Sequence, residues 1–261
     1  MGDLAQKLAG TRQLLDPILG ASKRLGACAL GHAGADAALR GGIARGALHE
    51  VFAGDASAAG FAVGLAQRVR AKKKLLWIRQ DFSALEHGEI SPTGLAELGI
   101  DPSCVLLLRA AHAEDALRAG ADALSCAALG AAIIEIPGNP KVLDLVASRR
   151  LVLGAQAKGV TVILLRPSAE AEPSAAQTRW LIRSSPSAEA DNWTTSAETE
   201  DWGEPRFDAA LARNRHGETG RWVMEWSCDD GAFRQPAEKA AHPRPVAAAP
   251  ADRPPAQALA G

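Results

Sequence analysis

The stretch LRGGIARGALHEVFAGDASAAGFAVG, residues 39–64, is the most informative part of this sequence about its fold. A glycine-rich turn precedes an apolar strand predicted over residues 47–53, and a small-residue loop beginning at Gly54 leads into a helix predicted over residues 60–70. This strand–loop–helix arrangement is the one in which the motif G-x-x-x-x-G-K-[ST] holds a nucleoside triphosphate. The segment therefore predicts an α/β fold with a phosphate-binding type of loop.

The residues that perform the chemistry of that motif are missing. Without a gap after Gly54, the places of the second glycine, the lysine and the hydroxyl residue fall on Ala59, Gly60 and Phe61. With one residue inserted, Gly60 is the second glycine, and Phe61 and Ala62 take the other two places. Neither alignment supplies an ammonium group for the β- and γ-phosphates or an oxygen for magnesium. We therefore expect a non-catalytic protein and assign no catalytic, cofactor-binding or metal-binding residue.

Composition limits the class of protein. The chain has 261 residues, is 47% hydrophobic and carries a net charge of −1, so it can bury a core and has no overall basic character for nucleic-acid binding. No apolar stretch approaches the length of a membrane span, and the first ten residues lack a signal-peptide core. We expect a cytoplasmic protein whose widely spaced cysteines are reduced, buried thiols; these are Cys28, Cys104, Cys126 and Cys228.

The middle of the chain alternates between short apolar strands and helices. Such alternation predicts a doubly wound, mostly parallel sheet with helices on both faces. Strands are predicted at residues 75–78, 105–108, 131–136 and 160–165, and helices at residues 93–99, 113–128 and 141–158.

The two ends of the chain differ from this pattern. Residues 1–38 are predicted to form an N-terminal arm, with an amphipathic helix over residues 3–19 followed by a glycine- and alanine-rich loop. The apolar face of that helix either covers the protein's own sheet or packs on a partner; its leucines are Leu4, Leu8, Leu15 and Leu19. The main domain spans residues 39–234, and residues 235–261 are rich in alanine and proline without periodicity, which predicts a disordered tail.

After Pro167 the pattern becomes antiparallel. Alternation around Trp180 predicts a half-buried edge strand, and alternation from Trp222 to Trp226 predicts a second strand. The acidic stretch 185–203 between them is predicted to be a mobile loop. Its tryptophans, Trp193 and Trp202, either hold the loop to the body or serve as anchors in an interface.

Several polar residues of the sequence are candidates for a functional role. His49 and Glu50 lie on the first strand without a visible partner, and His112, Glu114 and Asp115 lack a second set of metal ligands, so structural roles are expected for both groups. The basic clusters at residues 72–74 and 149–150 are interpreted as solvated helix ends.

Two connections were considered as contact surfaces. The run Arg213-Asn214-Arg215-His216-Gly217 is either a hairpin connection or a contact surface for a partner. Residues 167–177 contain two glutamates and no lysine, arginine or aromatic residue, which argues against binding of single-stranded DNA by this loop.

Five segments in a fixed order carry a resemblance to the ImuA family, the RecA-like proteins of bacterial damage-inducible mutagenesis cassettes. The resemblance implies a RecA-like domain with a degenerate phosphate loop. It extends from residue 39 to residue 226, and its segments are GGIARGALHEV, GFAVGLAQRV, LLWIRQD, TRWLIRSSPS and RNRHGETGRWVMEW.

The resemblance also suggests roles for two carboxylates and a set of partners. Asp81 falls near the place of the carboxylate that orients the attacking water in RecA-type ATPases, and Glu135 near that of the magnesium-organising aspartate. Without the lysine and the hydroxyl group, both are expected to be solvated strand-end residues. The implied partners are an ImuB-type relative of the Y-family polymerases, an error-prone replicative-type DNA polymerase and RecA itself. The expected function is that of an adaptor in SOS-induced error-prone translesion synthesis.

Two other functions remain open at this point. One is an active RecA-like ATPase that uses an unusual lysine from residues 72–74. The other is a cell-division inhibitor of the SulA type, which has a reduced RecA-like core.

Overall fold

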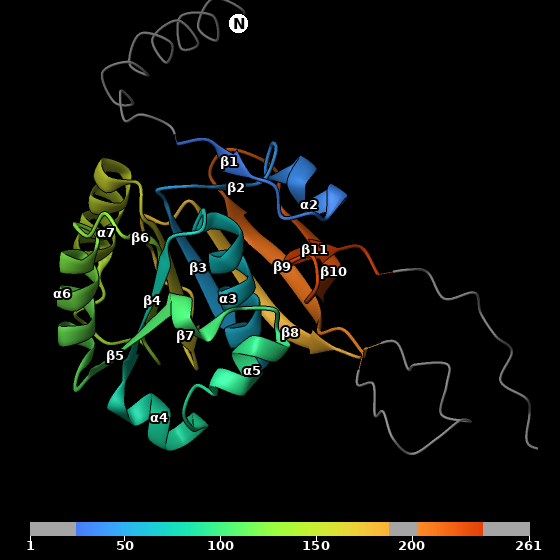
Figure 1. The fold of residues 1–261 in the computed structure, drawn as a ribbon. Coiled ribbons are helices and arrows are strands. Elements are labelled where there is room, and N and C mark those ends of the chain that lie inside the picture. Colours follow the sequence, from blue (N-terminus) through green and yellow to red (C-terminus); the bar gives the residue numbers. More distant parts are fainter. Residues whose placement is uncertain (1–24, 188–202, 237–261) are drawn as a thin grey trace, which may run out of the picture.

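Alternating strands and helices build a nine-stranded, mostly parallel sheet in the computed structural model of the protein (Figure 1). The structure describes residues 25–187 and 203–236. The predicted helix over residues 3–19, both tryptophans of the acidic loop, Trp193 and Trp202, and all but the first two residues of the predicted tail lie outside these ranges.

The strand order is β11-β10-β9-β8-β3-β7-β6-β4-β5. From β5 to β8 all neighbouring strands are parallel, and β9, β10 and β11 continue the sheet in antiparallel fashion. The predicted parallel sheet with an antiparallel extension is thus confirmed. The strands are β3 (Leu48–Ala53), β4 (Lys74–Gln80), β5 (Val105–Ala110), β6 (Leu129–Glu135), β7 (Thr161–Pro167), β8 (Thr178–Ser185), β9 (Arg206–Asn214), β10 (Gly220–Ser227) and β11 (Ala232–Arg234).

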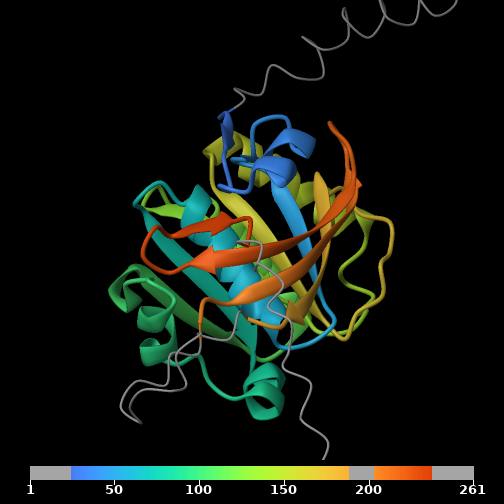
Figure 2. The same ribbon diagram turned by 90° about the vertical axis from the view of Figure 1, so that its right-hand side faces the viewer.

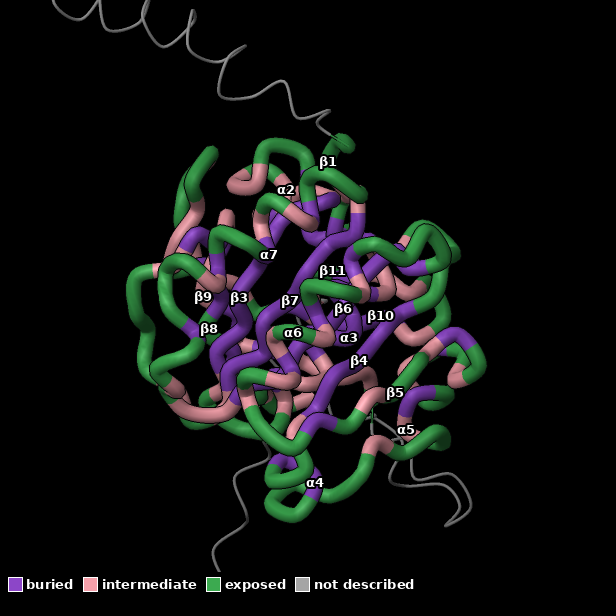
Figure 3. Tube along the Cα trace, turned by 90° about the vertical axis from the view of Figure 1, so that its left-hand side faces the viewer, coloured by how far each residue is buried: buried purple, intermediate pink, exposed green. Residues whose placement is uncertain are grey.

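Helices cover both faces of the parallel part of the sheet. Helix α3 (Ser57–Val69) packs on one face, and α6 (Ala113–Ala123) and α7 (Leu145–Lys158) pack on the other (Figure 1). The central strands are buried, whereas the outer sides of the helices are exposed (Figure 3). The arrangement agrees with a doubly wound α/β fold.

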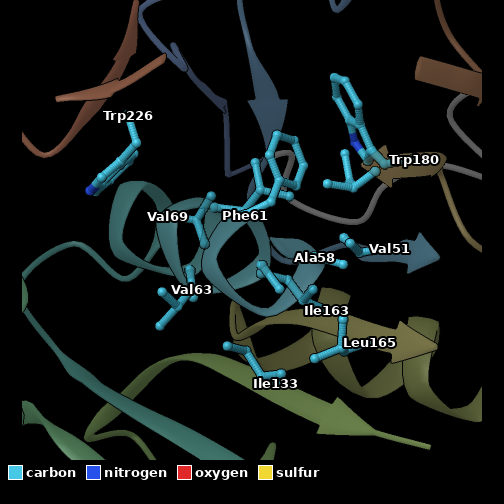
Figure 4. Packing of buried hydrophobic residues seen from close by; sticks show 14 of the residues in the cluster. Val51, Ala58, Phe61, Val63, Val69, Ile133, Ile163, Leu165, Trp180 and Trp226 are labelled. Atoms are coloured by element: carbon cyan, nitrogen blue, oxygen red, sulfur yellow. The ribbon is translucent and has the colours of Figure 1, made fainter. Parts of the chain in front are cut away.

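An aromatic cluster joins the antiparallel extension to α3. The Phe61 ring lies 5.4 Å from Trp180, 5.6 Å from Phe207 and 5.0 Å from Phe233, measured between ring centroids. Figure 4 shows Phe61 and Trp180 facing each other above the central strands. All four side chains are at most 3% exposed, so the extension wraps around α3 and shares its core.

Two expectations for the extension were wrong. Strand β8 is an interior strand, parallel to β3 and antiparallel to β9, and not an edge strand. Strand β9 was not predicted, and it includes Arg213 and Asn214 from the run interpreted as a connection. Its apolar side chains alternate correctly, but they are separated by arginine, aspartate and alanine, which obscured the pattern.

The glycine-rich segment before β3 has more structure than a loop. It contains β1 (Ala27–Cys28), the short helix α2 (Ala33–Ala38) and β2 (Ile43–Ala44), which pairs with β1. Gly42 has a φ of 121°, and a Cβ atom there would lie 2.1 Å from the carbonyl oxygen of Cys28. The turn therefore requires glycine at this position.

The connection between β4 and β5 also contains more helix than predicted. It comprises α4 (Asp81–His87), α5 (Pro92–Glu97) and the 3₁₀ turn η1 (Pro102–Cys104), of which only α5 was expected. Helix α7 begins at Leu145, four residues later than predicted. Within the described ranges, no helix has the length and apolar character needed to cross a bilayer.

The cysteines are only partly as expected. All four are free, but only Cys104 is buried, and Cys126 is exposed. Burial and the neighbouring Glu204 raise the pKa of Cys228 to about 12, so this thiol stays protonated at neutral pH.

Candidate functional site

A cavity of about 460 Å³ opens at the carboxyl ends of β3, β4, β6 and β7. This edge of a parallel sheet is where doubly wound folds bind their ligands. The loop after β3 forms one wall, and α5 and the segment before it form another. Trp77 from the middle of β4, Arg79 near its end and Glu135 at the end of β6 also line the cavity. The cavity thus occupies the place where an intact phosphate loop would hold a nucleotide.

The loop between β3 and α3 contains a carboxylate, that of Asp55, beside the start of α3. One carboxylate oxygen of Asp55 accepts the backbone N–H of Ser57 at 3.0 Å. The other accepts the backbone N–H and the hydroxyl of Ser184, each at 2.8 Å. Desolvation raises the pKa of Asp55, but hydrogen bonds from Ser184 and Ser57 outweigh it and lower the pKa to about 2.

The ionised Asp55 therefore occupies the surroundings that favour a phosphate in related loops. A helix N-terminus attracts negative charge through its free N–H groups and its dipole. Here that attraction is satisfied by a side chain of the loop, which also ties the loop to β8. A phosphate approaching the same N–H group would meet a negative charge.

In the gapped alignment the place of the motif's lysine is part of the core, whereas Gly60, its place in the ungapped alignment, lines the cavity. Phe61 is fully buried and points away from the cavity, toward Trp180, Phe207 and Phe233. Ala62, in the place of the hydroxyl residue in the gapped alignment, is also fully buried. In the gapped alignment, an apolar residue and not a lysine is therefore expected at position 61, because this position of α3 packs against the antiparallel extension.

Glu135 was expected to be a solvated strand-end residue, and this expectation was wrong. Its side chain is 4% exposed and forms an ion pair with Arg79 of β4, with 2.8 Å between Arg79 Nε and Glu135 Oε2. Trp77 Nε1 donates to the same carboxylate at 3.2 Å. Arg79 also donates to the carbonyl oxygens of Gly88 and Ser83. The carboxylate is thereby neutralised by a side chain of the protein.

Asp81 lies apart from this pair, as a solvated residue at the start of α4. Its side chain is 55% exposed and pairs with Arg109 at 3.1 Å, and Arg109 also pairs with Glu89 at 2.6 Å. Asp81 and Glu135 therefore have different cationic partners. Among the residues described, no three histidine, cysteine, aspartate or glutamate side chains gather as a metal site would require.

The histidine and glutamate on β3 have structural partners. His49 is fully buried, with Nδ1 at 2.7 Å from the Thr178 hydroxyl and Nε2 at 2.9 Å from the Ala44 carbonyl oxygen. Burial lowers its pKa to about 4, so the ring is neutral at pH 7. Glu50 pairs with Arg179 of β8 at 2.8 Å. The interpretation of His49 as a hydrogen-bonded structural residue is confirmed.

The remaining candidates are dispersed. Glu114 and Asp115 both pair with Arg118 on α6, and the nearby His112 makes no capping bond. Lys72 and Lys73 are exposed before β4, and Lys74 Nζ donates to the carbonyl oxygen of Ser103. Arg149 and Arg150 are exposed on α7. Of the run 213–217, Asn214 bonds to carbonyl oxygens of Ala38 and Glu218 and so fastens the end of β9.

Three residues that form the principal polar contacts around the loop and the cavity were not predicted from the sequence: Asp55, Arg79 and Ser184. Asp55 could have been recognised, because an aspartate in a turn often accepts the backbone N–H two residues further on, as it does here from Ser57. Arg79 and Ser184 gave no local signal, because their partners lie 56 and 129 residues away in the chain. The sequence as a whole matches no protein-family model and no curated protein.

Proposed function

We propose that the protein is a non-catalytic, RecA-like accessory protein of SOS-induced error-prone translesion DNA synthesis that acts through protein partners. The observation that carries the non-catalytic part is the position of Asp55, whose carboxylate is bound at the α3 N-terminus in place of a phosphate. The RecA-like part is supported by the strand–loop–helix unit formed by β3, the loop at Gly54 and α3, in which β3 is an interior strand of the parallel sheet.

The surroundings of the cavity support loss of nucleotide chemistry. A triphosphate needs a cation near the loop, but Arg79, which lines the cavity, is paired with Glu135. Arg183 packs against Gly54 of the loop, but it lines a neighbouring groove and not this cavity. Lys72 and Lys73 precede β4 and Lys74 is its first residue, whereas the cavity lies toward the other end of the strand. At about 3.3 Å per residue, the length of β4 places them roughly 20 Å away. This separation argues against an active ATPase with an unusual lysine.

The cellular role rests on the resemblance of five segments between residues 39 and 226 to the ImuA family. The proposed partners are the ImuB-type polymerase relative, the error-prone replicative-type polymerase and RecA. No cofactor is needed for a role that consists of holding these proteins together.

A genetic experiment tests this role against that of a SulA-type division inhibitor. Deletion of the gene should lower the frequency of damage-induced mutations as much as deletion of the gene for the ImuB-type partner, and a tagged copy should co-purify that partner. Overexpression should leave cell length unchanged. Filamentation on overexpression, together with an unchanged mutation frequency in the deletion strain, would favour the division inhibitor instead.

A further inference from the structure

The outer face of the antiparallel extension is rich in arginine. Side chains of β8 alternate between the inner face, where Trp180 and Ile182 are buried, and the outer face, where Leu181 and Arg183 are exposed. The pairing of β8 with β9, and of β9 with β10, extends this outer face across three strands. We term it the arginine face; its members are Arg179, Leu181, Arg183, Arg206, Asp208, Ala210, Arg213, Arg221, Val223 and Glu225, with Arg166 of β7 beside them.

Among the described elements, no helix covers this part of the sheet. Strands β9 and β10 lie in front of α3 in Figure 2, with their outer face toward the viewer. Leu181 and Val223 are each 44% exposed, although both are aliphatic residues in the middle of strands. These two side chains supply apolar area on a face that is otherwise charged.

Positive charge is in excess on this face. Three of its arginines are paired with carboxylates: Arg179 with Glu50, Arg206 with Glu225 and Arg221 with Asp208. The other three, Arg166, Arg183 and Arg213, form no ion pair among residues 25–187 and 203–236. The net charge of the whole chain is −1, so the excess of arginine on this face results from how the strands are arranged and not from an excess of basic residues in the sequence.

The unpaired arginines differ in their accessibility. Arg166 is only 3% exposed and donates to the carbonyl oxygens of Ile136 and Gly138, so it is buried at the border of the face. Arg213 is half-buried and donates to the carbonyl oxygen of Ser174. Arg183 is exposed and, within the described residues, has no hydrogen-bond partner. It interacts electrostatically with Asp208, but it forms no ion pair within residues 25–187 and 203–236, so its guanidinium group can bind an incoming carboxylate.

A groove runs beside Arg183. It has a volume of about 290 Å³, with Phe52, Leu181 and Ala210 among its apolar lining residues and Ala169 and Ala171 contributed by the loop after β7. Arg183 and the Arg221–Asp208 pair also line it. The groove thus combines an apolar floor with a cationic border.

We propose that the arginine face binds an extended acidic segment of a partner protein, with a carboxylate on Arg183 and an apolar side chain in the groove over Leu181. This inference rests on the proposed adaptor function and assigns a surface to it. Charge complementarity favours an acidic partner. A peptide strand with alternating acidic and apolar side chains matches a surface on which arginines and aliphatic side chains alternate.

Single-stranded nucleic acid fits the same surface less well. A binder of single strands needs flat aromatic side chains on which bases stack. The tryptophans of β8 and β10 lie on the inner face, and Phe52 is 4% exposed beneath the guanidinium groups of Arg166 and Arg179. Asp208 and Glu225 among the arginines would also repel a continuous phosphate backbone.

Fluorescence anisotropy with three labelled probes tests the proposal on the full-length protein. The probes are a short peptide of alternating glutamate and leucine, a peptide of equal charge with serine in place of leucine, and a single-stranded oligonucleotide. The first peptide should bind most tightly. Arg183→Glu and Leu181→Asp should each weaken its binding at least about tenfold. Lys73→Glu, which makes the same charge change at the opposite end of the sheet, should leave binding within about twofold.

The outcomes separate this inference from the proposed function. Because both positions are exposed, the variants should melt at the wild-type temperature, and the milder Arg183→Gln provides a second variant of the same guanidinium. Absence of peptide binding, or equal binding by wild type and Arg183→Glu, would overturn the inference. Oligonucleotide binding that Arg183→Glu abolishes would assign the face to nucleic acid instead. If the peptide does not bind but the ImuB-type partner still co-purifies, the assignment of this surface is wrong and the proposed function stands.

Discussion

Arg79 of β4 and Glu135 of β6 form a buried ion pair with 2.8 Å between Nε and Oε2, at the carboxyl ends of the central strands. In an ATPase of the resembled type, a carboxylate at this place organises magnesium. Here the guanidinium group takes the role of the cation, and Trp77 completes the hydrogen bonding of the carboxylate. The pair is a buried structural element at this edge of the sheet.

The first prediction concerns this pair. Glu135→Gln should lower the free energy of unfolding by about 3–5 kcal/mol, because the variant leaves the Arg79 charge buried without a partner. The double variant Arg79→Met with Glu135→Gln should be less destabilised than Glu135→Gln alone. Urea denaturation measures both, and Glu89→Gln serves as the control, since that exposed pair with Arg109 should contribute less than about 1 kcal/mol. Equal effects of Glu135→Gln and Glu89→Gln would show that the buried pair is unimportant.

The second prediction concerns Asp55. Asp55→Ala should destabilise the protein by about 1 kcal/mol at pH 7, because the Ser57 N–H at the start of α3 loses its acceptor and the loop loses its bonds to Ser184. The folded-state pKa of about 2 lies below the ordinary 3.8, so this stabilisation is fully present above pH 3.8 and is lost as the pH falls toward 2. Thermal unfolding of wild type and Asp55→Asn over this range measures it. A difference between the two that stays constant down to pH 2 would refute the assignment.

The third prediction concerns His49. Its folded-state pKa of about 4 lies below the ordinary 6.5, so protons bind the unfolded state first as the pH falls. Stability should therefore decrease between pH 6.5 and pH 4, by roughly 3 kcal/mol if His49 acts alone. In His49→Gln this slope should be much smaller, whereas His87→Gln, at an exposed position on α4, should retain it. Denaturation midpoints measured across this range decide the matter.

The fourth prediction concerns Phe61. Phe61→Lys should lower the free energy of unfolding by more than about 3 kcal/mol, because a charge replaces a fully buried ring. It should not create ATP hydrolysis, since the side chain at this position points into the aromatic cluster. Phe61→Leu should cost less than Phe61→Lys. A stable Phe61→Lys variant that hydrolyses ATP would mean that the helix presents this residue to the cavity.

The parallel core could be predicted from sequence because its strands are short apolar runs, and β3, β4, β5 and β6 are each followed by a helix. The edge assignment of β8 failed because alternation around Trp180 reports that one face is buried, but not which strands lie on either side. Strand β9 was missed because Phe207, Ala209 and Leu211 are separated by polar and small residues.

The site could be predicted only in part. The absence of the lysine and hydroxyl residues was visible in residues 54–62, but their replacement by an internal carboxylate and a buried ion pair was not. Asp55–Ser184 and Arg79–Glu135 join residues far apart in the chain, and a single sequence contains no signal that pairs them. The arginine face was hidden for the same reason, because its arginines come from separate strands and form no cluster along the sequence.

Binding of magnesium-ATP to the purified full-length protein tests the central claim most directly. Isothermal titration calorimetry at millimolar nucleotide should show no saturable heat, and a coupled assay should show no hydrolysis above that of buffer. Saturable, magnesium-dependent hydrolysis that is lost in Glu89→Gln, a variant at an exposed residue lining the cavity, would contradict the account.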